Sequence, residues 1–298
     1  MNFQEWNLKV PWGNLALLSY GNPSGDPVLV VHGRLDSAAT FIPLLKLLPT
    51  NYHYVLFDMP GHGRSDPFWK GQLPNRFLGV PVIELVVKHL RWKEFIYIGH
   101  SLGAEQGLFY AAMYPKQIKK AIYFDIGPSV IYCCPQHFRN HFQATYEAYY
   151  DNYRKYDSER TMTEGEARQS VTNARQLSDE DADIVLSRNL VEVSPGSYKL
   201  TWDRRFKILP GFNSLHSDFY HDLFTMHPTP ALFICAKDMR AFYQPSGLAV
   251  KVMSTLTARA NVKVIWVDGG HDVHLTNPER FASELVQFLE SDVARSKL

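Results

Sequence analysis

Short apolar runs rich in β-branched and aromatic residues alternate with longer helical patterns along most of this chain. The runs expected as strands are 28–33, 54–58, 95–99, 120–125, 231–236 and 262–267. The stretches expected as helices are 38–48, 77–91, 102–114, 241–257 and 278–290. Most of the strand-like runs are continuously apolar, which is typical of parallel strands that helices cover on both faces. The alternation therefore predicts an α/β fold with a mostly parallel, doubly wound sheet, preceded by an antiparallel hairpin.

One interval interrupts this alternation. It runs from about residue 126 to residue 228, which is too long for a simple connection between two strands. We therefore expect a helical cap at 128–227, inserted over the strand ends of a core formed by 1–127 and 228–298. Ligands of doubly wound sheets bind outside the carboxyl ends of the strands, so the cap is expected to cover the site.

The interval has helical features of its own. Ser178 precedes three acidic residues, a pattern that indicates a capped helix start. Aromatic residues at three- and four-residue spacing form a stripe near its beginning. Packing within the cap is the favoured interpretation of this stripe. Contact with an apolar substrate is the alternative, and the candidates for it are Phe138, Phe142 and Tyr146.

Ser101 lies between a predicted strand and a predicted helix, in the stretch Gly99-His100-Ser101-Leu102-Gly103. A G-x-S-x-G motif at such a junction forms a turn so tight that small residues are needed on both sides. The turn exposes the serine hydroxyl at the edge of the sheet, and the following helix directs its first amides at the same point. Ser101 is therefore the candidate nucleophile.

A serine nucleophile needs a base, and the base needs an acid that orients it. In this architecture both follow the serine, in the order acid and then histidine, each after a later strand. Asp238 and His271 occupy these places and are the predicted pair. Asp125 also ends a strand and is the alternative acid, and His274 is the alternative base. Two carboxylates flank the histidine and are expected to be solvated: Asp268 and Asp272.

The loop after the first apolar run is expected to complete the site. The backbone N–H of Arg34 is predicted to form an oxyanion hole with the N–H of Leu102. The Arg34 side chain is expected to face solvent or pair locally, and contact with an anionic part of a substrate is the alternative. His32 is expected to bond loop backbone. The loop 58–66 is expected to brace the site rather than to take part in catalysis.

These residues together resemble the α/β-hydrolase superfamily. The resemblance rests on His32-Gly33, DMPGHGRSD, GHSLG, Asp238 and GGHDVHLTNPERF, which occur in the family's order and approximate spacing. Within the superfamily, HGRLDSAATFIPLLKLLP and YKLTWDRRFK resemble the serine hydrolase-like proteins of the Kraken group. Arg34 departs from the aromatic residue usual after His-Gly, and Cys235 departs from the glycine usual before the acid.

The resemblance implies a serine hydrolase that cleaves a carboxylic ester or thioester through an acyl-enzyme, without a metal or organic cofactor. The expected substrate is a small, lipid-like acyl compound. Two alternatives remain open. One is a cofactor-free lyase, C–C bond hydrolase or oxygenase that uses the same residues, and the other is a non-catalytic ligand-binding member of the fold.

Composition limits the partners. The 298 residues carry a formal net charge of +1, and their basic and acidic residues are scattered, so neither nucleic acid nor a charged membrane surface is expected as a partner. No signal peptide or membrane-spanning segment is expected. Three cysteines without metal-type spacing indicate small, buried or half-buried side chains rather than a disulfide framework. The final residues, Ser296-Lys297-Leu298, match a peroxisomal address and predict a peroxisomal import receptor as partner, with a cytoplasmic location as the alternative.

Overall fold

The computed structural model describes residues 3–71, 73–127, 143–208, 217–227, 229–243 and 248–292. Eight strands form one sheet in the order β1-β2-β4-β3-β5-β6-β9-β10. Their bounds are β1 Gln4–Val10, β2 Gly13–Gly21, β3 Pro27–Val31, β4 His53–Phe57, β5 Phe95–His100, β6 Ile118–Phe124, β9 Ala231–Ala236 and β10 Val262–Val267. β1 and β2 pair antiparallel with each other, β2 pairs antiparallel with β4, and the pairs from β4 to β10 are parallel. The mostly parallel sheet and its leading hairpin confirm the predicted fold class.

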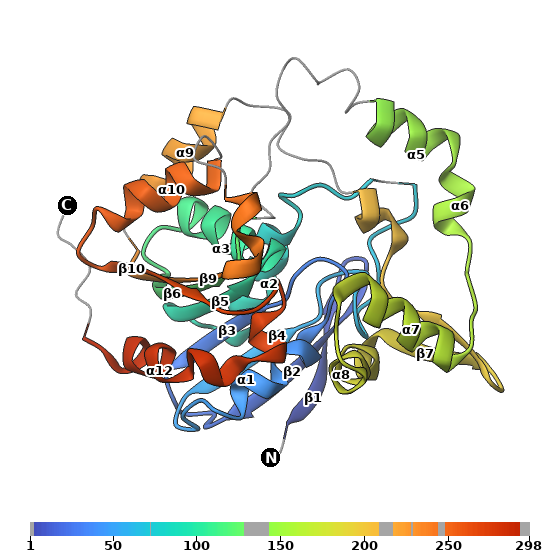
Figure 1. The fold of residues 1–298 in the computed structure, drawn as a ribbon, viewed down its shortest axis with the longest axis horizontal. Helices are drawn as coiled ribbons and strands as arrows, with labels where there is room; N and C mark the ends of the chain where they lie inside the picture. Colours follow the sequence, from blue (N-terminus) through green and yellow to red (C-terminus); the bar gives the residue numbers. More distant parts are fainter. Residues whose placement is uncertain are drawn as a thin grey trace.

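Helices cover both faces of this sheet (Figure 1). One face packs against α2 (Gly79–Leu90), α3 (Leu102–Met113), α9 (Ser217–Thr225) and α10 (Leu248–Thr257). The other packs against α1 (Ile42–Leu45), α11 (Val273–Thr276) and α12 (Ala282–Glu290). Along β5, Phe95 and Tyr97 face the first layer and Ile96 and Ile98 face the second. Both faces are buried, and this explains why the strand sequences are continuously apolar.

A different set of elements lies between β6 and β9. It contains η3 (Gln143–Glu147), α5 (Ala148–Asp151), α6 (Tyr153–Asp157), α7 (Glu164–Arg175), α8 (Asp179–Asn189), the hairpin of β7 (Leu190–Ser194) and β8 (Ser197–Leu200), and η4 (Arg204–Ile208). Ser178 caps α8 as predicted, since its hydroxyl accepts a hydrogen bond from the N–H of Asp181 at 3.1 Å. The helices α7 and α8 bury their own apolar cluster, around Ala167, Val171 and Val185. The β7–β8 hairpin was not predicted.

Two arginines, the buried Arg188 and the half-buried Arg175, connect this segment to the core. Arg188 of α8 lies 2.7 Å from Asp58 after β4, and Arg175 of α7 lies 2.5 Å from Asp272. α9 also falls inside the interval expected as the cap, yet it packs on α3, with the rings of Phe109 and Phe224 at a centroid distance of 4.8 Å. The segment therefore contacts the core at several separate points.

Three short 3-10 helices complete the described chain: η1 (Ala38–Phe41), η5 (Lys237–Phe242) and η6 (Pro278–Arg280). No helix in the described ranges combines the length and apolar character needed to cross a membrane. Cys235 is a buried free thiol, as predicted for the cysteines. Cys133 and Cys134 lie outside the described residues.

Candidate active site

Ser101 takes a strained backbone conformation between β5 and α3, with φ 51° and ψ −116°. A positive φ is uncommon for a residue with a side chain and is concentrated at functional sites. The flanking glycines are required by close backbone packing. A Cβ on Gly99 would lie 2.7 Å from the backbone of Gly103, and one on Gly103 would lie 2.3 Å from the carbonyl oxygen of Val31. The motif therefore forms the tight strand-to-helix turn that the sequence predicted.

His271 lies in the loop after β10 and pairs with the residue that follows β6. Its Nδ1 atom is 2.5 Å from Oδ2 of Asp125. The carboxylate is fully buried, whereas the His271 side chain keeps 29% of its area exposed. An imidazole that donates Nδ1–H to a carboxylate keeps Nε2 available to accept a proton, which is the tautomer that a general base needs. The alternative acid considered from the sequence is therefore the one that contacts the histidine.

Three groups orient the Asp125 carboxylate. Its Oδ1 atom accepts hydrogen bonds from the N–H of Ala236 at 3.1 Å and from the hydroxyl of Tyr243 at 2.9 Å. The same hydroxyl accepts a hydrogen bond from the N–H of Gly127 at 2.9 Å. Burial, with Cys235 and Asp125 nearby, raises the pKa of Tyr243, so the phenol stays protonated and donates. With the bond to His271, these contacts hold the carboxylate in one orientation.

Within the described residues, Asp238 makes no hydrogen bond or ion pair with His271, which corrects the pairing expected from the sequence. After β9 the chain turns at once into η5, and Asp238 is exposed at the surface. Its main chain, rather than its carboxylate, meets the His271 loop: the N–H of Asp238 donates to the carbonyl oxygen of Gly269 at 3.3 Å. The turn into η5 thus separates this carboxylate from the position that Asp125 occupies.

His100 is a neighbour of the pair that the sequence analysis treated only as part of the serine motif. Its Nε2–H donates to the carbonyl oxygen of His271 at 2.9 Å, and the two ring centroids are 4.6 Å apart. Burial, together with His274 and His271, lowers the pKa of His100 well below its ordinary value, so the ring is neutral. His100 therefore links the residue before Ser101 directly to the main chain of His271.

The loop after β3 packs against the serine turn. A Cβ built on Gly33 would lie 3.2 Å from Cβ of Ser101 and 2.8 Å from Nδ1 of His100, so glycine is needed there. Arg34 follows directly, which places its backbone beside Ser101. The first amides of α3, including that of Leu102, have no partner within the helix. The two predicted oxyanion donors therefore come from segments that border the same serine.

The polar residues around this loop brace it, as predicted. His32 donates Nδ1–H to the carbonyl oxygen of Gly33 at 2.7 Å, and its Nε2 accepts from the N–H of Met59 at 2.9 Å. Burial lowers the pKa of His32 to about 4, which keeps it neutral. Asp58 accepts hydrogen bonds from the N–H groups of Ala38 and Arg64, both at 2.8 Å. The loops after β3 and β4 are thus joined by hydrogen bonds.

Comparison with known proteins identifies the family. The alpha/beta hydrolase fold family matches residues 26–170. A serine hydrolase-like protein of Danio rerio is 31% identical over 290 residues, which cover 96% of this chain and 88% of that protein. The chain belongs to the α/β-hydrolase family. A serine hydrolase-like protein 2 of Homo sapiens is 27% identical over 299 residues, covering 96% of this chain and 94% of that protein. The resemblance to the serine hydrolase-like group is therefore confirmed.

Solved structures share the fold of this α/β-hydrolase. A hypothetical protein from Pseudomonas aeruginosa PAO1 superimposes with a TM-score of 0.80 at 23% identity, over 96% of this chain and 97% of that one. A thioesterase domain from the curacin biosynthetic pathway superimposes with a TM-score of 0.77 at 21% identity, over 96% of this chain and 100% of that one. Both confirm the α/β-hydrolase fold expected from the motifs.

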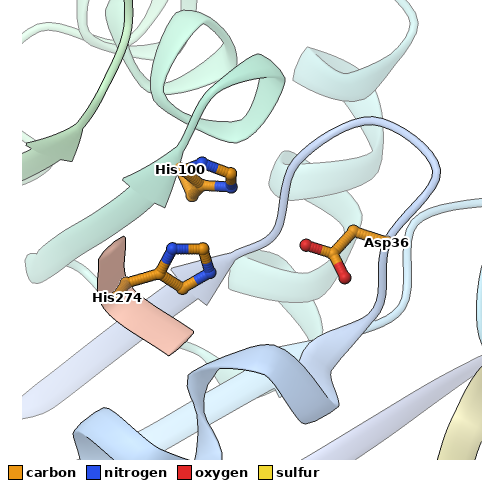
Figure 2. Close-up of side chains that lie close together, drawn as sticks. All are labelled: Asp36, His100 and His274. Atoms are coloured by element: carbon orange, nitrogen blue, oxygen red, sulfur yellow. The ribbon is translucent and has the colours of Figure 1, made fainter. Parts of the chain in front are cut away.

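Figure 2 shows three buried side chains of the hydrolase, whose ligand atoms lie within 4.8 Å of one another: Asp36, His100 and His274. The carboxylate is already bonded, to the N–H of Ser37 at 2.9 Å and the hydroxyl of Thr40 at 3.2 Å. It also faces the guanidinium of Arg175 at 3.4 Å. The rings of His100 and His274 contact each other in a tilted arrangement, with a centroid distance of 4.1 Å and an interplanar angle of 36°. A metal ion would compete with the guanidinium for this carboxylate, so the donor set does not fit a metal site.

Asp272 is buried and paired, which corrects its expected exposure. The guanidinium of Arg175 lies 2.5 Å from Oδ1 and 3.0 Å from Oδ2 of Asp272. Burial alone would raise the pKa of Asp272, but the Arg175 charge holds it at about 2. Asp268 is exposed as expected and pairs with Lys237 at 2.8 Å. The residue after His271 is thus anchored to α7.

The substrate-binding predictions lie outside the described residues. They are Phe138, Phe142 and the side chain of Tyr146. The residues of the predicted peroxisomal address also lie outside the described residues: Ser296, Lys297 and Leu298. A pocket of about 790 Å³ lies between the loop at 63–67 and the β7–β8 hairpin, and its lining includes none of Ser101, Asp125 or His271. The candidate active site is therefore defined by its catalytic groups rather than by a described pocket.

Proposed function

We propose that this α/β-hydrolase is a serine hydrolase that cleaves a carboxylic ester or thioester of a lipid-like acyl group. The observation that carries the proposal is the combination of Ser101 on a strained turn with a buried Asp125–His271 pair at 2.5 Å. Strain of this kind persists only where surrounding structure imposes it. The pair supplies an oriented base of the type that activates a serine hydroxyl.

Each catalytic group has one role in the proposed reaction. The Oγ atom of Ser101 attacks the acyl carbonyl while Nε2 of His271 takes its proton. The amides of Arg34 and Leu102 bind the oxyanion of the tetrahedral intermediate. The intermediate collapses when the C–O or C–S bond breaks and His271 returns the proton to the leaving alcohol or thiol. Asp125 stabilises the imidazolium throughout.

Water completes the cycle. His271 takes a proton from a water molecule, the resulting hydroxide adds to the acyl-enzyme carbonyl, and a second tetrahedral intermediate forms. Its collapse breaks the bond to Ser101, returns the proton to Oγ and releases the carboxylic acid. The names of two fold neighbours, the curacin thioesterase domain and the Mycobacterium tuberculosis esterase Rv0045c, support acyl transfer of this class.

Covalent labelling tests the nucleophile. A fluorophosphonate probe should add one equivalent to Ser101, and Ser101→Ala should abolish labelling while the protein remains folded by circular dichroism. Turnover should then appear on a panel of acyl esters and acyl thioesters of varied chain length. A folded wild-type protein that neither labels nor hydrolyses any member of the panel would contradict the proposal.

We also propose that the C-terminal tripeptide directs the enzyme to peroxisomes, because this sequence is a receptor-read address when it ends a chain. A fluorescent protein fused to the N-terminus should accumulate in peroxisomes of cultured cells. Removal of residues 296–298 should leave the fusion in the cytoplasm. A punctate, peroxisomal signal from the truncated fusion would refute the assignment.

A further inference from the structure

The side chain of Arg34 begins next to the nucleophile. Gly33 packs so closely on Ser101 that a Cβ added to it would lie 3.2 Å from Cβ of the serine. Arg34 is the next residue, and the following residue, Leu35, has a positive φ of 54° that turns the loop away. The Arg34 side chain therefore starts from a backbone position that borders Ser101.

This guanidinium lacks an acidic partner, unlike the other arginines near the site. Arg175 is paired with Asp36 and Asp272, and Arg76 is paired with Glu105. Within the described part of the chain, Arg34 has no hydrogen bond and no ion pair, and its one electrostatic neighbour is another cation, Arg76.

The surroundings of Arg34 are also partly desolvated. Arg34 is exposed at the surface, yet partial desolvation and the nearby charge of Arg76 lower its pKa below the ordinary value. The charge of Arg76 is compensated by its ion pair with Glu105, whereas Arg34 has no acidic partner within the described part of the chain. A guanidinium without an acidic partner, on the loop that borders a nucleophile, favours a bound anion.

We propose that Arg34 binds an anionic oxygen group carried on the acyl chain of the substrate, a carboxylate in the simplest case. Arginine suits this role because its planar fork donates two parallel hydrogen bonds to a carboxylate. Arg76 is held by its ion pair with Glu105, so its charge is already balanced and Arg34 is the group left to meet an anion of the substrate. The inference rests on the proposed hydrolase function and narrows its substrates to acyl groups with a second, charged end.

Matched esters test the inference on the full-length protein. The 4-nitrophenyl esters of hexanoic acid and of adipic acid differ only in a terminal methyl or carboxylate, and both release the same phenol. For wild type and variants, kcat/KM is measured for each ester after subtraction of spontaneous hydrolysis. The adipoyl-to-hexanoyl ratio of kcat/KM then reports recognition of the anion.

Arg34→Gln should lower this ratio by about tenfold or more, in line with the strength of a charged hydrogen bond at a partly exposed site. Arg34→Lys should lower it less, because the charge remains and the fork is lost. Arg160→Gln is the matched control, since it removes an exposed arginine from the 790 Å³ pocket, whose lining does not include Ser101. The control should leave the ratio unchanged.

The outcomes separate the inference from the proposed function. An equal effect of Arg34→Gln on both esters, or failure of the wild type to accept the adipoyl ester while it cleaves the hexanoyl ester, would overturn the inference and leave the hydrolase function intact. Hexanoyl-coenzyme A, assayed as a third substrate, carries its anionic groups on the leaving thiol. If Arg34→Gln lowers kcat/KM for this thioester alone, the anion lies on the leaving group and the acyl-side assignment is overturned. No turnover of any of these substrates and no labelling of Ser101 would remove the hydrolase function itself.

Discussion

The replacement Asp125→Asn is the most direct test of the candidate active site. The asparagine oxygen can take the place of Oδ1 and accept from Ala236 and Tyr243, as the carboxylate does now at 3.1 and 2.9 Å. Its NH₂ group then faces Nδ1 of His271, where Oδ2 lies now at 2.5 Å. An NH₂ group cannot accept from Nδ1–H, so the imidazole moves its proton to Nε2 and can no longer take one from serine.

The size of the effect follows from this change of tautomer. Loss of the acid in a serine–histidine–acid triad with the geometry retained lowers kcat by about 10⁴-fold. That factor corresponds to about 5 kcal/mol of transition-state stabilisation. We expect Asp125→Asn to lose activity on this scale on a 4-nitrophenyl ester. Its thermal unfolding should stay near that of the wild type, because the two hydrogen bonds to Oδ1 and the main-chain bond to Ile234 are kept.

Asp238→Asn is the matched control. Asp238 is exposed, and within the described structure its carboxylate makes no hydrogen bond to His271. Surface substitutions of this kind change little, so kcat should stay within about twofold of the wild type. The rate of fluorophosphonate labelling provides a second readout that does not depend on the choice of substrate. A large loss in Asp238→Asn together with near-normal activity in Asp125→Asn would refute the assignment of the acid.

Two further predictions concern stability. Arg175→Met should lower the free energy of unfolding in urea by about 3–5 kcal/mol, because it leaves two buried carboxylates facing each other without their shared cation. The exposed ion pair of Arg168 with Asp183, on the same helix, should contribute much less because solvent screens it, so an equal loss in Arg168→Met would contradict this account. Stability should also fall as the pH is lowered from about 6.5, since burial lowers the pKa of three histidines to about 4: His32, His62 and His274. The unfolded chain then binds more protons than the folded one, and each histidine removes about 2 kcal/mol by pH 5. Chemical unfolding at several pH values measures this slope, and equal stability at pH 7 and pH 5 would refute it.

The sheet was predictable because strands that are buried on both faces have continuously apolar sequences. The continuous apolar runs correspond to the parallel strands, and Ser101 is found at the strand-to-helix junction that its flanking glycines indicated. The helices α7 and α8 were foreseen only in general character, through the cap residue Ser178. The β7–β8 hairpin could not be predicted in this way, because its side chains are half-buried or exposed and do not follow a clear apolar pattern.

Local sequence patterns could not show which of the two aspartates, Asp125 or Asp238, pairs with His271. Asp125 and Asp238 lie one and two residues after adjacent strands, and both precede the histidine. What separates them is the path of the chain afterwards. Asp125 has a positive φ of 42°, and the chain beyond β9 coils into η5. Neither feature can be inferred from a single aspartate in a loop, and the pairing of Arg175 with Asp272 depends on tertiary contact in the same way.

The two aspartates are not interchangeable in this fold, because β9 lies between β6 and β10 and Asp125 must reach past it. The N–H of Asp125 donates to Ile234 of β9 at 2.8 Å, and its Oδ1 accepts from Ala236 at the end of the same strand. Tyr243 packs so tightly that a Cβ on Gly127 would lie 2.4 Å from its ring. The contacts that orient the acid thus come from the end of β9 and from the residue that follows η5. Asp238 lies within η5 itself, so it cannot replace Asp125 without displacing the segment that holds the acid in position.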